Sequence, residues 1–234
     1  ILKRTADSYR RMRNTVRFLL GNLHGFDPAL DQVAPADLVE LDAWAIARTR
    51  ELQAEINTAY RDYAFHLIYQ KVHNFCIVDL GGLYLDVLKD RLYTTPAKSH
   101  ARRSAQTAML HIVEAMVRWL APILSFTAEE IWQYLPGKRG ESVQCELWHA
   151  LPEVPASAIA WPALLALRAA VTRELEKLRD TGAIGAPLEA QVDVWCSPAE
   201  YPKLSVLGDE LRFLLITSAA RIHEGVPPPD SVQV

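Results

Sequence analysis

The apolar residues between Met109 and Leu120 constrain the fold of this chain more than any other feature. They recur every three or four positions, which places them on one face of a helix with 3.6 residues per turn. A helix with such an apolar stripe is stable in water only when other elements cover the stripe. Proline lacks a backbone N–H and clashes with the preceding turn, so Pro122 ends or kinks this helix. The stripe comprises Met109, Ile112, Val113, Met116, Val117 and Leu120.

Segments with the same period predict the helices that cover this stripe. A first helix is predicted before the sequence GFDP at residues 25–28, which ends it. A second helix is predicted to begin near Asp37, because Asp37 and Glu40 have the spacing of a capping box. Four or five long helices joined by short links make a helical bundle. The apolar arc of the first helix is formed by Tyr9, Met12, Val16, Leu19, Leu20 and Leu23.

Residues 60–93 also have helical periodicity, with a break expected near Gly81 and Gly82. Glycine weakens a helix interior, and Asp79 could cap a new helix at this point.

The segment after Pro122 predicts a short helix over residues 128–134. Thr127 and Glu130 are spaced as a capping box, and Phe126 and Ile131 as a hydrophobic staple. We expect this helix to turn back over the bundle end and to have a structural role only.

The pattern changes from about residue 150 onward. A helix is predicted from Pro162 to Asp180, an alternating strand over residues 188–196, a helix over 198–216 and a closing strand over 218–225. The predicted fold is therefore mainly α, a helical bundle followed by a small α+β domain. We expect domains at residues 1–149 and 150–226, with a linker at 227–234. Because the chain opens in mid-pattern without methionine, we expect it to be a piece of a longer protein.

Charge is unevenly distributed along the chain. The whole chain has a formal net charge of −3, which by itself indicates neither nucleic acid nor a membrane as partner. Within residues 1–17, however, six lysines and arginines stand against Asp7 alone. Such a basic segment is typical of a surface that binds polyanions. The three cysteines are widely spaced, which favours reduced thiols in a cytosolic protein over disulfides. We find no motif of catalytic or paired metal-ligating residues.

Phe18 lies roughly opposite the apolar arc of the first helix, among arginines and asparagines. One interpretation is a stacking platform for an unpaired base, with arginines on phosphates and an asparagine on a base edge. The other is that Phe18 packs under a neighbouring element and the arginines are solvated, which the pattern alone favours. A second basic cluster, Lys98, Arg102 and Arg103, precedes or begins the next long helix, where positive charge opposes the helix dipole. An anionic partner would explain that placement.

Several segments, in order and at plausible intervals, resemble the bacterial isoleucyl branch of the class I aminoacyl-tRNA synthetases. They are ADSYRRMRNTVRFLLGNLHGFDP, HNFCIVDLGGLYLDVLKDRLYT, RRSAQTAMLHIVEAMVRWLAPILSFTAEEIWQYLP and LGDELRFLLITS. The resemblance implies an anticodon-binding helical domain with a junction domain, and an isoleucine-specific tRNA as partner. It implies that the catalytic and editing domains, which use ATP and isoleucine, lie elsewhere in the same chain. It also implies a zinc site only in a later cysteine-rich module, so no metal and no cofactor are expected here.

Carried over by position, the resemblance implies that the first helix lies beside the anticodon stem-loop. The tRNA-binding residues that it implies are Arg10, Arg13, Asn14, Arg17 and Phe18, with Arg102 and Arg103 as phosphate contacts. The protein is expected to be a cytoplasmic monomer that is not bound to a membrane, and the chain itself is expected to carry no catalytic residue. Two alternatives remain: a helical protein-interaction scaffold, or the same module from a valyl- or leucyl-type synthetase.

Overall fold

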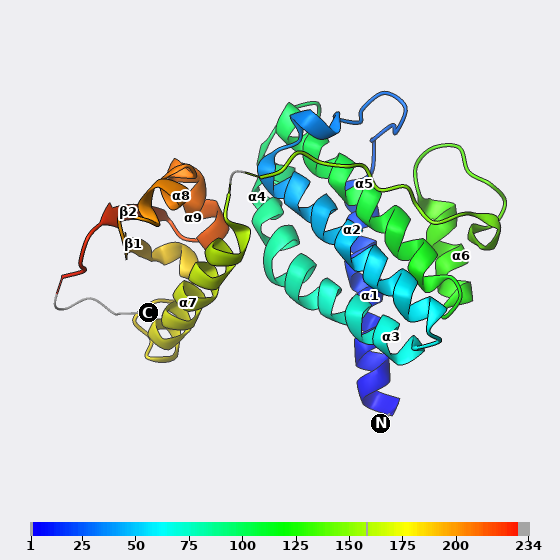
Figure 1. The fold of residues 1–234 in the computed structure, drawn as a ribbon, viewed down its shortest axis with the longest axis horizontal. Helices are drawn as coiled ribbons and strands as arrows, with labels where there is room; N and C mark the ends of the chain where they lie inside the picture. The colour runs from blue at the N-terminus through cyan, green and yellow to red at the C-terminus, as the bar shows by residue number, and fades with distance from the viewer. Residues whose placement is uncertain (1, 158, 229–234) are drawn as a thin grey trace. The chain divides into compact units, whose positions relative to one another are not determined.

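The computed structural model describes residues 2–157 and 159–228. They form two compact units, and the boundary between the units in the sequence lies between Pro155 and Ala156. The first unit is a bundle of α-helices, and the second combines helices with a small sheet (Figure 1). The mainly α fold with a small α+β part is thus confirmed. The helices of the first unit are α1 (Leu2–Asn22), α2 (Glu40–Arg61), α3 (Phe65–Asn74), α4 (Leu85–Thr94), α5 (His100–Leu120) and α6 (Ser125–Tyr134).

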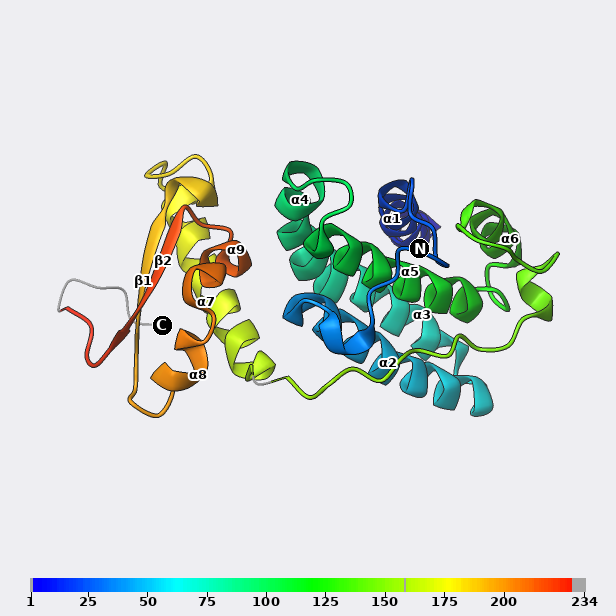
Figure 2. The same ribbon diagram turned by 90° about the horizontal axis from the view of Figure 1, so that it is seen from above.

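Helix α5 is the centre of the bundle. Its predicted apolar stripe is buried: Leu120 is 4% exposed, and the other five residues are at 0%, namely Met109, Ile112, Val113, Met116 and Val117. Helices α1, α2, α4 and α6 all pack against it, so that α5 is covered on several sides (Figure 2). It ends at Leu120, two residues before Pro122, as the sequence predicts.

The start of α6 differs from the prediction. The helix begins at Ser125 rather than after Thr127, and its N-cap residue Leu124 provides no side-chain cap. The hydrophobic staple is wrong as well, since Phe126 is 94% exposed while Ile131 is buried. The side chains of Thr127 and Glu130 contact α1 instead of capping their own helix. The same spacing that suits a capping box also places two residues on one face of a helix.

The start of α2 also differs from the prediction. Asp37 lies in a 3₁₀ turn (Pro35–Asp37), and the N-cap residue is Val39, so the predicted capping box is wrong. The backbone N–H of Val39 donates to Ser104 Oγ of α5 at 2.9 Å. A hydrogen bond from another helix thus satisfies a group that the sequence pattern assigned to a local cap.

Asp42, in the first turn of α2, is fully buried and joins three other segments. Its carboxylate accepts hydrogen bonds from Tyr84 Oη at 2.8 Å, Arg91 Nη1 at 2.6 Å and Ser104 Oγ at 2.5 Å. Burial raises the pKa of the Asp42 carboxyl, and Arg91, Ser104 and Tyr84 oppose that rise. A buried carboxylate is tolerated only with such partners, so Asp42 fixes α2 against α4 and α5.

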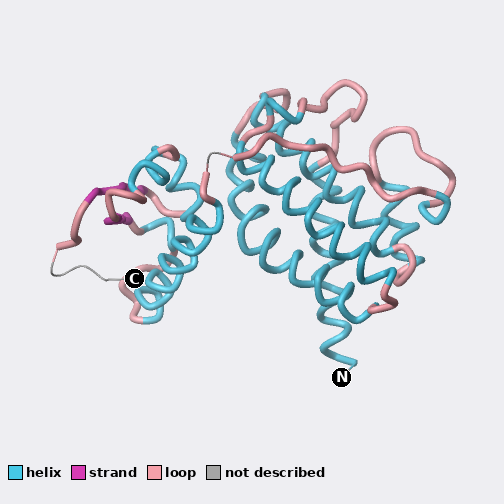
Figure 3. The backbone as a smooth tube through the Cα atoms, in the orientation of Figure 1, coloured by secondary structure: helices cyan, strands magenta, loops and turns pink. Residues whose placement is uncertain are grey.

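The break predicted near Gly81 does not occur. A π-helical segment (Phe75–Tyr84) joins α3 to α4 in one continuous helical rod (Figure 3). In this wide helix a Cβ at Gly81 would lie 2.9 Å from the carbonyl oxygen of Cys76, so a side chain would force the backbone to move. Asp79 pairs with Arg48 of α2 at 3.3 Å instead of capping a helix. The glycine pair therefore permits a wide turn rather than a break.

Residues 146–155, which we call the strap, run along α2 and α5 without regular structure. Arg118 of α5 donates to the carbonyl of Leu147 at 2.8 Å, and Gln53 of α2 donates to that of His149 at 2.9 Å. His149 Nε2 lies 2.9 Å from His111 Nδ1 on α5, so one neutral ring donates and the other accepts. Burial lowers the pKa of His149 to about 4, with the nearby His111 lowering it further, and burial also lowers the pKa of His111.

The second unit contains a two-stranded parallel sheet covered by helices. Strand β1 (Gln191–Cys196) pairs in register with β2 (Ala219–Glu224), Gln191 opposite Ala219. The predicted alternation is confirmed for Ala190, Val194 and Cys196, which are buried, but Leu188 is 61% exposed. Leu188 lies in a 3₁₀ turn before the strand, which explains its exposure. The helices of this unit are α7 (Trp161–Asp180), α8 (Tyr201–Ser205) and α9 (Leu211–Leu215).

The single helix predicted over residues 198–216 is wrong. Gly208 has a φ of +47°, which interrupts the helix between α8 and α9. Glycine adopts this left-handed conformation without the penalty that a Cβ imposes.

We predict that Asp42→Asn lowers the free energy of unfolding by about 3 kcal/mol, because it leaves Arg91 without its buried counter-charge. Urea unfolding would measure this change. Asp86→Asn is the matched control on α4, since among the described residues Asp86 forms an ion pair only with Lys89, at the surface. We expect the control to change stability by less than about 0.5 kcal/mol. Equal effects of the two substitutions would contradict the role of Asp42.

We predict that Gly81→Ala lowers the free energy of unfolding by about 1–2 kcal/mol despite the higher helix propensity of alanine. Gly21→Ala in α1 is the control, because a Cβ there meets no described atom within 4 Å apart from its chain neighbours and the backbone of its own helix. The control should stabilise the protein by up to about 1 kcal/mol. If both variants are stabilised, the segment relaxes to an ordinary α-helix and the steric argument is wrong.

We predict that His149→Gln makes stability less dependent on pH. Unfolded histidines take up a proton near pH 6.5, whereas His111 and His149 resist protonation in the folded protein. The unfolded state therefore binds more protons as pH falls from about 6.5 to 4, and stability is lost over that range. Thermal unfolding at several pH values would compare the variant with wild type and with His66→Gln, which removes an exposed histidine. Parallel curves for all three proteins would contradict the prediction.

Candidate functional site

Helix α1 presents part of its predicted polar face to solvent. Arg10, Asn14 and Arg17 are exposed, and Phe18 is half-buried. Arg10 pairs with Asp7 at 2.9 Å on the same helix. The side chains of Asn14 and Arg17 make no hydrogen bond or ion pair with any group in the part of the chain that the structure describes. These two residues are available to an external partner.

Arg13, by contrast, is used within the protein. Its guanidinium makes two hydrogen bonds of 2.7 Å to the carboxylate of Glu130 on α6. One turn earlier on each helix, Tyr9 Oη lies 3.0 Å from Thr127 Oγ1. Glu130 and Tyr9 raise the pKa of Arg13, and Arg13 in turn lowers the pKa of Glu130. The two pairs join α1 and α6, which run in the same direction.

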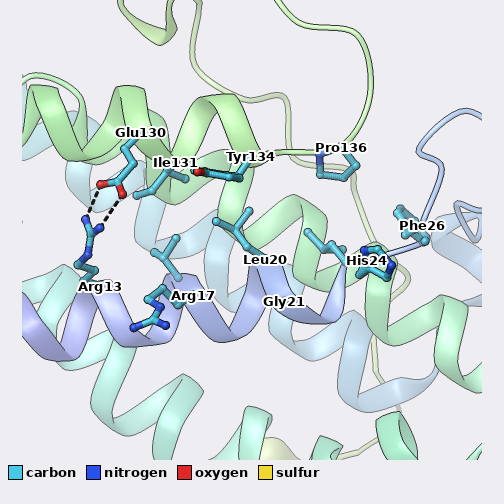
Figure 4. Close-up of a pocket in the computed structure, with 13 residues that line it drawn as sticks. Arg13, Arg17, Leu20, Gly21, His24, Phe26, Glu130, Ile131, Tyr134 and Pro136 are labelled. Carbon is cyan, nitrogen blue, oxygen red and sulfur yellow. Dashed lines mark hydrogen bonds and ion pairs between the residues drawn. The ribbon is translucent and has the colours of Figure 1, made fainter.

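An open groove of about 780 Å³ extends between α1 and α6 from the Arg13–Glu130 pair toward the chain after each helix (Figure 4). Its apolar surface is formed mainly by α1 residues such as Leu20 and by Ile131 of α6. Arg17, His24 and Tyr134 provide polar groups along it. An apolar groove with a few polar groups is the usual form of a ligand site.

Arg103 is also engaged by groups of the protein. Its guanidinium pairs with Asp31 at 3.1 Å and donates to Gln106 Oε1 at 2.7 Å, and its side chain is only 12% exposed. Arg102 is half-buried, and its Nε atom is buried without a hydrogen-bond partner among the described residues. Gln106 Nε2 donates to the carbonyl of Asn22, so this cluster lies beside the C-terminal end of α1.

The two predicted basic clusters lie at different positions along α1. Arg10 and Asn22 are twelve residues apart, roughly 18 Å along the helix, whereas Arg17 and Asn22 are five residues apart, roughly 8 Å. A partner that contacts both Arg10 and the cluster of Arg102 and Arg103 must therefore extend along more than half of the helix.

His24, Glu130 and Tyr134 were not predicted as site residues. The sequence interpretation gave α6 a structural role only, whereas α6 forms one wall of the groove. Tyr134 is 72% exposed. One local feature of the sequence could have indicated the groove. Gly21 is a glycine in the interior of a predicted helix, and it does not mark the end of the apolar pattern of that helix.

His111 of α5 lies against His149 of the strap. Arg118 and Arg139 each bind Glu114 at 2.5 Å, so that carboxylate is already paired. Although burial raises the pKa of Glu114, these arginines lower it below its usual value.

Within residues 2–157 and 159–228, no three His, Cys, Asp or Glu side chains are grouped to bind a metal ion. None of the described helices is sufficiently long and apolar to cross a membrane.

Comparison with known proteins gave consistent matches. A family model described as the anticodon-binding domain of tRNA ligase matches residues 42–194. The isoleucine–tRNA ligase of Halorhodospira halophila is 60% identical over 233 residues, which are 98% of this chain and 25% of that protein. The isoleucine–tRNA ligases of Nitrosococcus oceani and Thioalkalivibrio sulfidiphilus are 58% and 59% identical, each over 98% of this chain and 25% of their own length. The chain thus spans about a quarter of the length of the curated relatives it matches.

Proposed function

The chain belongs to the family of anticodon-binding domains of tRNA ligases, and from this we propose that it binds the anticodon stem-loop of an isoleucine tRNA. The observation that carries the proposal is the exposed polar face of α1, where Asn14 and Arg17 have no partner among the described residues. The similarity to isoleucine–tRNA ligases extends over α1 as well, although the family model begins after it. That similarity favours the isoleucyl branch over the valyl and leucyl alternatives.

We propose that Arg10 and Arg17 bind RNA phosphates and that Asn14 contacts a base edge. Phe18 would stack on an unpaired base with the part of its ring that remains exposed. Arg102 would contact phosphates at the other end of α1. Arg13 and Arg103 are already paired within the protein, so we propose that they stabilise the structure of the RNA-binding surface. They would contact phosphates only through the exposed edges of their guanidinium groups.

In the longer protein, this domain would position the tRNA for a ligase reaction. We propose that the catalytic part, which joins isoleucine to the tRNA using ATP, and the editing part lie outside this chain. A zinc site is expected only in a later module. We further propose that the whole enzyme is a cytoplasmic monomer.

We predict that Arg17→Gln weakens binding of an isoleucine anticodon stem-loop RNA by this chain. Removal of one phosphate contact should also reduce the slope of log K against log salt by about 0.7–0.9. Fluorescence anisotropy over a salt series would measure both quantities. Arg179→Gln is the matched control, because Arg179 is an exposed arginine of α7 that pairs with Glu176 on its own helix.

A second RNA with an exchanged anticodon tests whether the binding is specific. Tighter binding of the native anticodon supports the proposal. If wild type binds neither RNA at low salt, the proposal is wrong and an interaction scaffold becomes the better interpretation.

A further inference from the structure

The groove between α1 and α6 has the shape and lining of a site for a flat ligand. On the α6 side, the exposed ring of Tyr134 lies opposite Leu20 and Gly21 of α1 (Figure 4). The apolar side chains of Leu20 and Ile131 lie between the two helices. An aromatic ring beside apolar side chains binds a flat ligand by stacking on one face and by van der Waals contact on the other.

Gly21 keeps the groove open opposite Tyr134. Glycine in a helix interior costs about 1 kcal/mol relative to alanine. Apart from its two chain neighbours and the backbone of its own helix, a Cβ at Gly21 would meet no described atom within 4 Å, so packing against the rest of the described chain does not require glycine there. The φ of Gly21 is not positive, so the backbone conformation does not require it either. A ligand that lies close to the α1 backbone would explain why glycine stands at this position although neither packing nor backbone conformation requires it.

The charges around the groove indicate an anionic ligand. Glu130 is neutralised by Arg13 at one end, through two hydrogen bonds. Arg17, on the next turn of α1, lines the groove and has no described partner. Further basic residues precede it on the same helix, with Asp7 as the single acidic residue in positions 1–17. The groove therefore offers stacking and apolar contact beside one available cation.

We propose that this groove binds one unpaired nucleobase of the RNA loop. The base stacks on Tyr134, its other face lies over Leu20 and Gly21, and its phosphate pairs with Arg17. Arg13 and Glu130 close the groove at one end and thereby set how far the base can move along it. This inference rests on the proposed function, because the ligand is part of the same RNA.

The test measures binding of the isoleucine anticodon stem-loop RNA to the chain and to groove variants. Tyr134→Ala should weaken binding about tenfold, within the range measured for loss of one base–aromatic stack. Tyr134→Phe should bind like wild type, because the ring remains. Gly21→Leu should fill the groove and weaken binding to a similar extent while leaving the helix content in circular dichroism unchanged. Phe126→Ala is the matched control, since Phe126 is a 94% exposed aromatic residue on the same helix.

An abasic scan of the loop identifies the nucleotide. Removal of one base should weaken wild-type binding about tenfold and have little further effect on Tyr134→Ala, because both changes remove the same contact. If wild type prefers the native anticodon while Tyr134→Ala and Gly21→Leu bind like wild type, the groove proposal is wrong and the proposed function stands. A loss with Tyr134→Phe as large as with Tyr134→Ala contradicts stacking. If wild type does not bind the RNA at all, both proposals are overturned.

Discussion

The buried carboxylate of Asp42 constrains the arrangement of the whole first unit. A charge removed from water costs several kcal/mol unless hydrogen-bond donors replace the water that it loses. Those donors come from the π-helical segment, α4 and α5, so these elements can pack on α2 in only one arrangement. The apolar stripe of α5 supplies most of the driving force for packing, but an apolar stripe alone tolerates small shifts and rotations. With α5 fixed against α2, its remaining surface receives α1 and α6.

The arginines of the first unit divide into two groups by their surroundings. Arg13 and Arg103 are each bound by a carboxylate from another segment, and both connect elements of the bundle. Arg17 differs from Arg13 by one turn of the same helix, yet it lies beside an open groove and remains available. Arg13 lies opposite Glu130, whereas Arg17 lies opposite open space, and this accounts for the difference between them. The position of an arginine in the sequence therefore does not determine whether it can bind a ligand.

Elements with strong periodicity could be predicted from the sequence, and contacts between helices could not. The stripe of α5, the end of that helix before Pro122 and the alternation of β1 all follow from local patterns. Thr127 and Glu130 have the spacing of a cap, but residues three apart also share a helix face, and here they face α1. Gly81 was interpreted as the site of a helix break. A glycine suits a π-helical segment as well, and no local rule distinguishes the two. The groove was not predicted, because Tyr134 and Gly21 are far apart in sequence and meet only after the bundle forms.

The parallel direction of α1 and α6 gives the groove an electrical polarity. Each helix has a partial negative charge of about half an elementary charge at its C-terminal end, where carbonyl groups point outward. Helix α1 ends at Asn22 and α6 at Tyr134, so both negative ends lie at the same end of the groove. In an antiparallel pair these fields would largely cancel, whereas here they add. An anionic group is repelled from that end and attracted toward Arg17, while hydrogen-bond donors are favoured near the carbonyls. The direction of two helices thus determines which way round a polar ligand would lie.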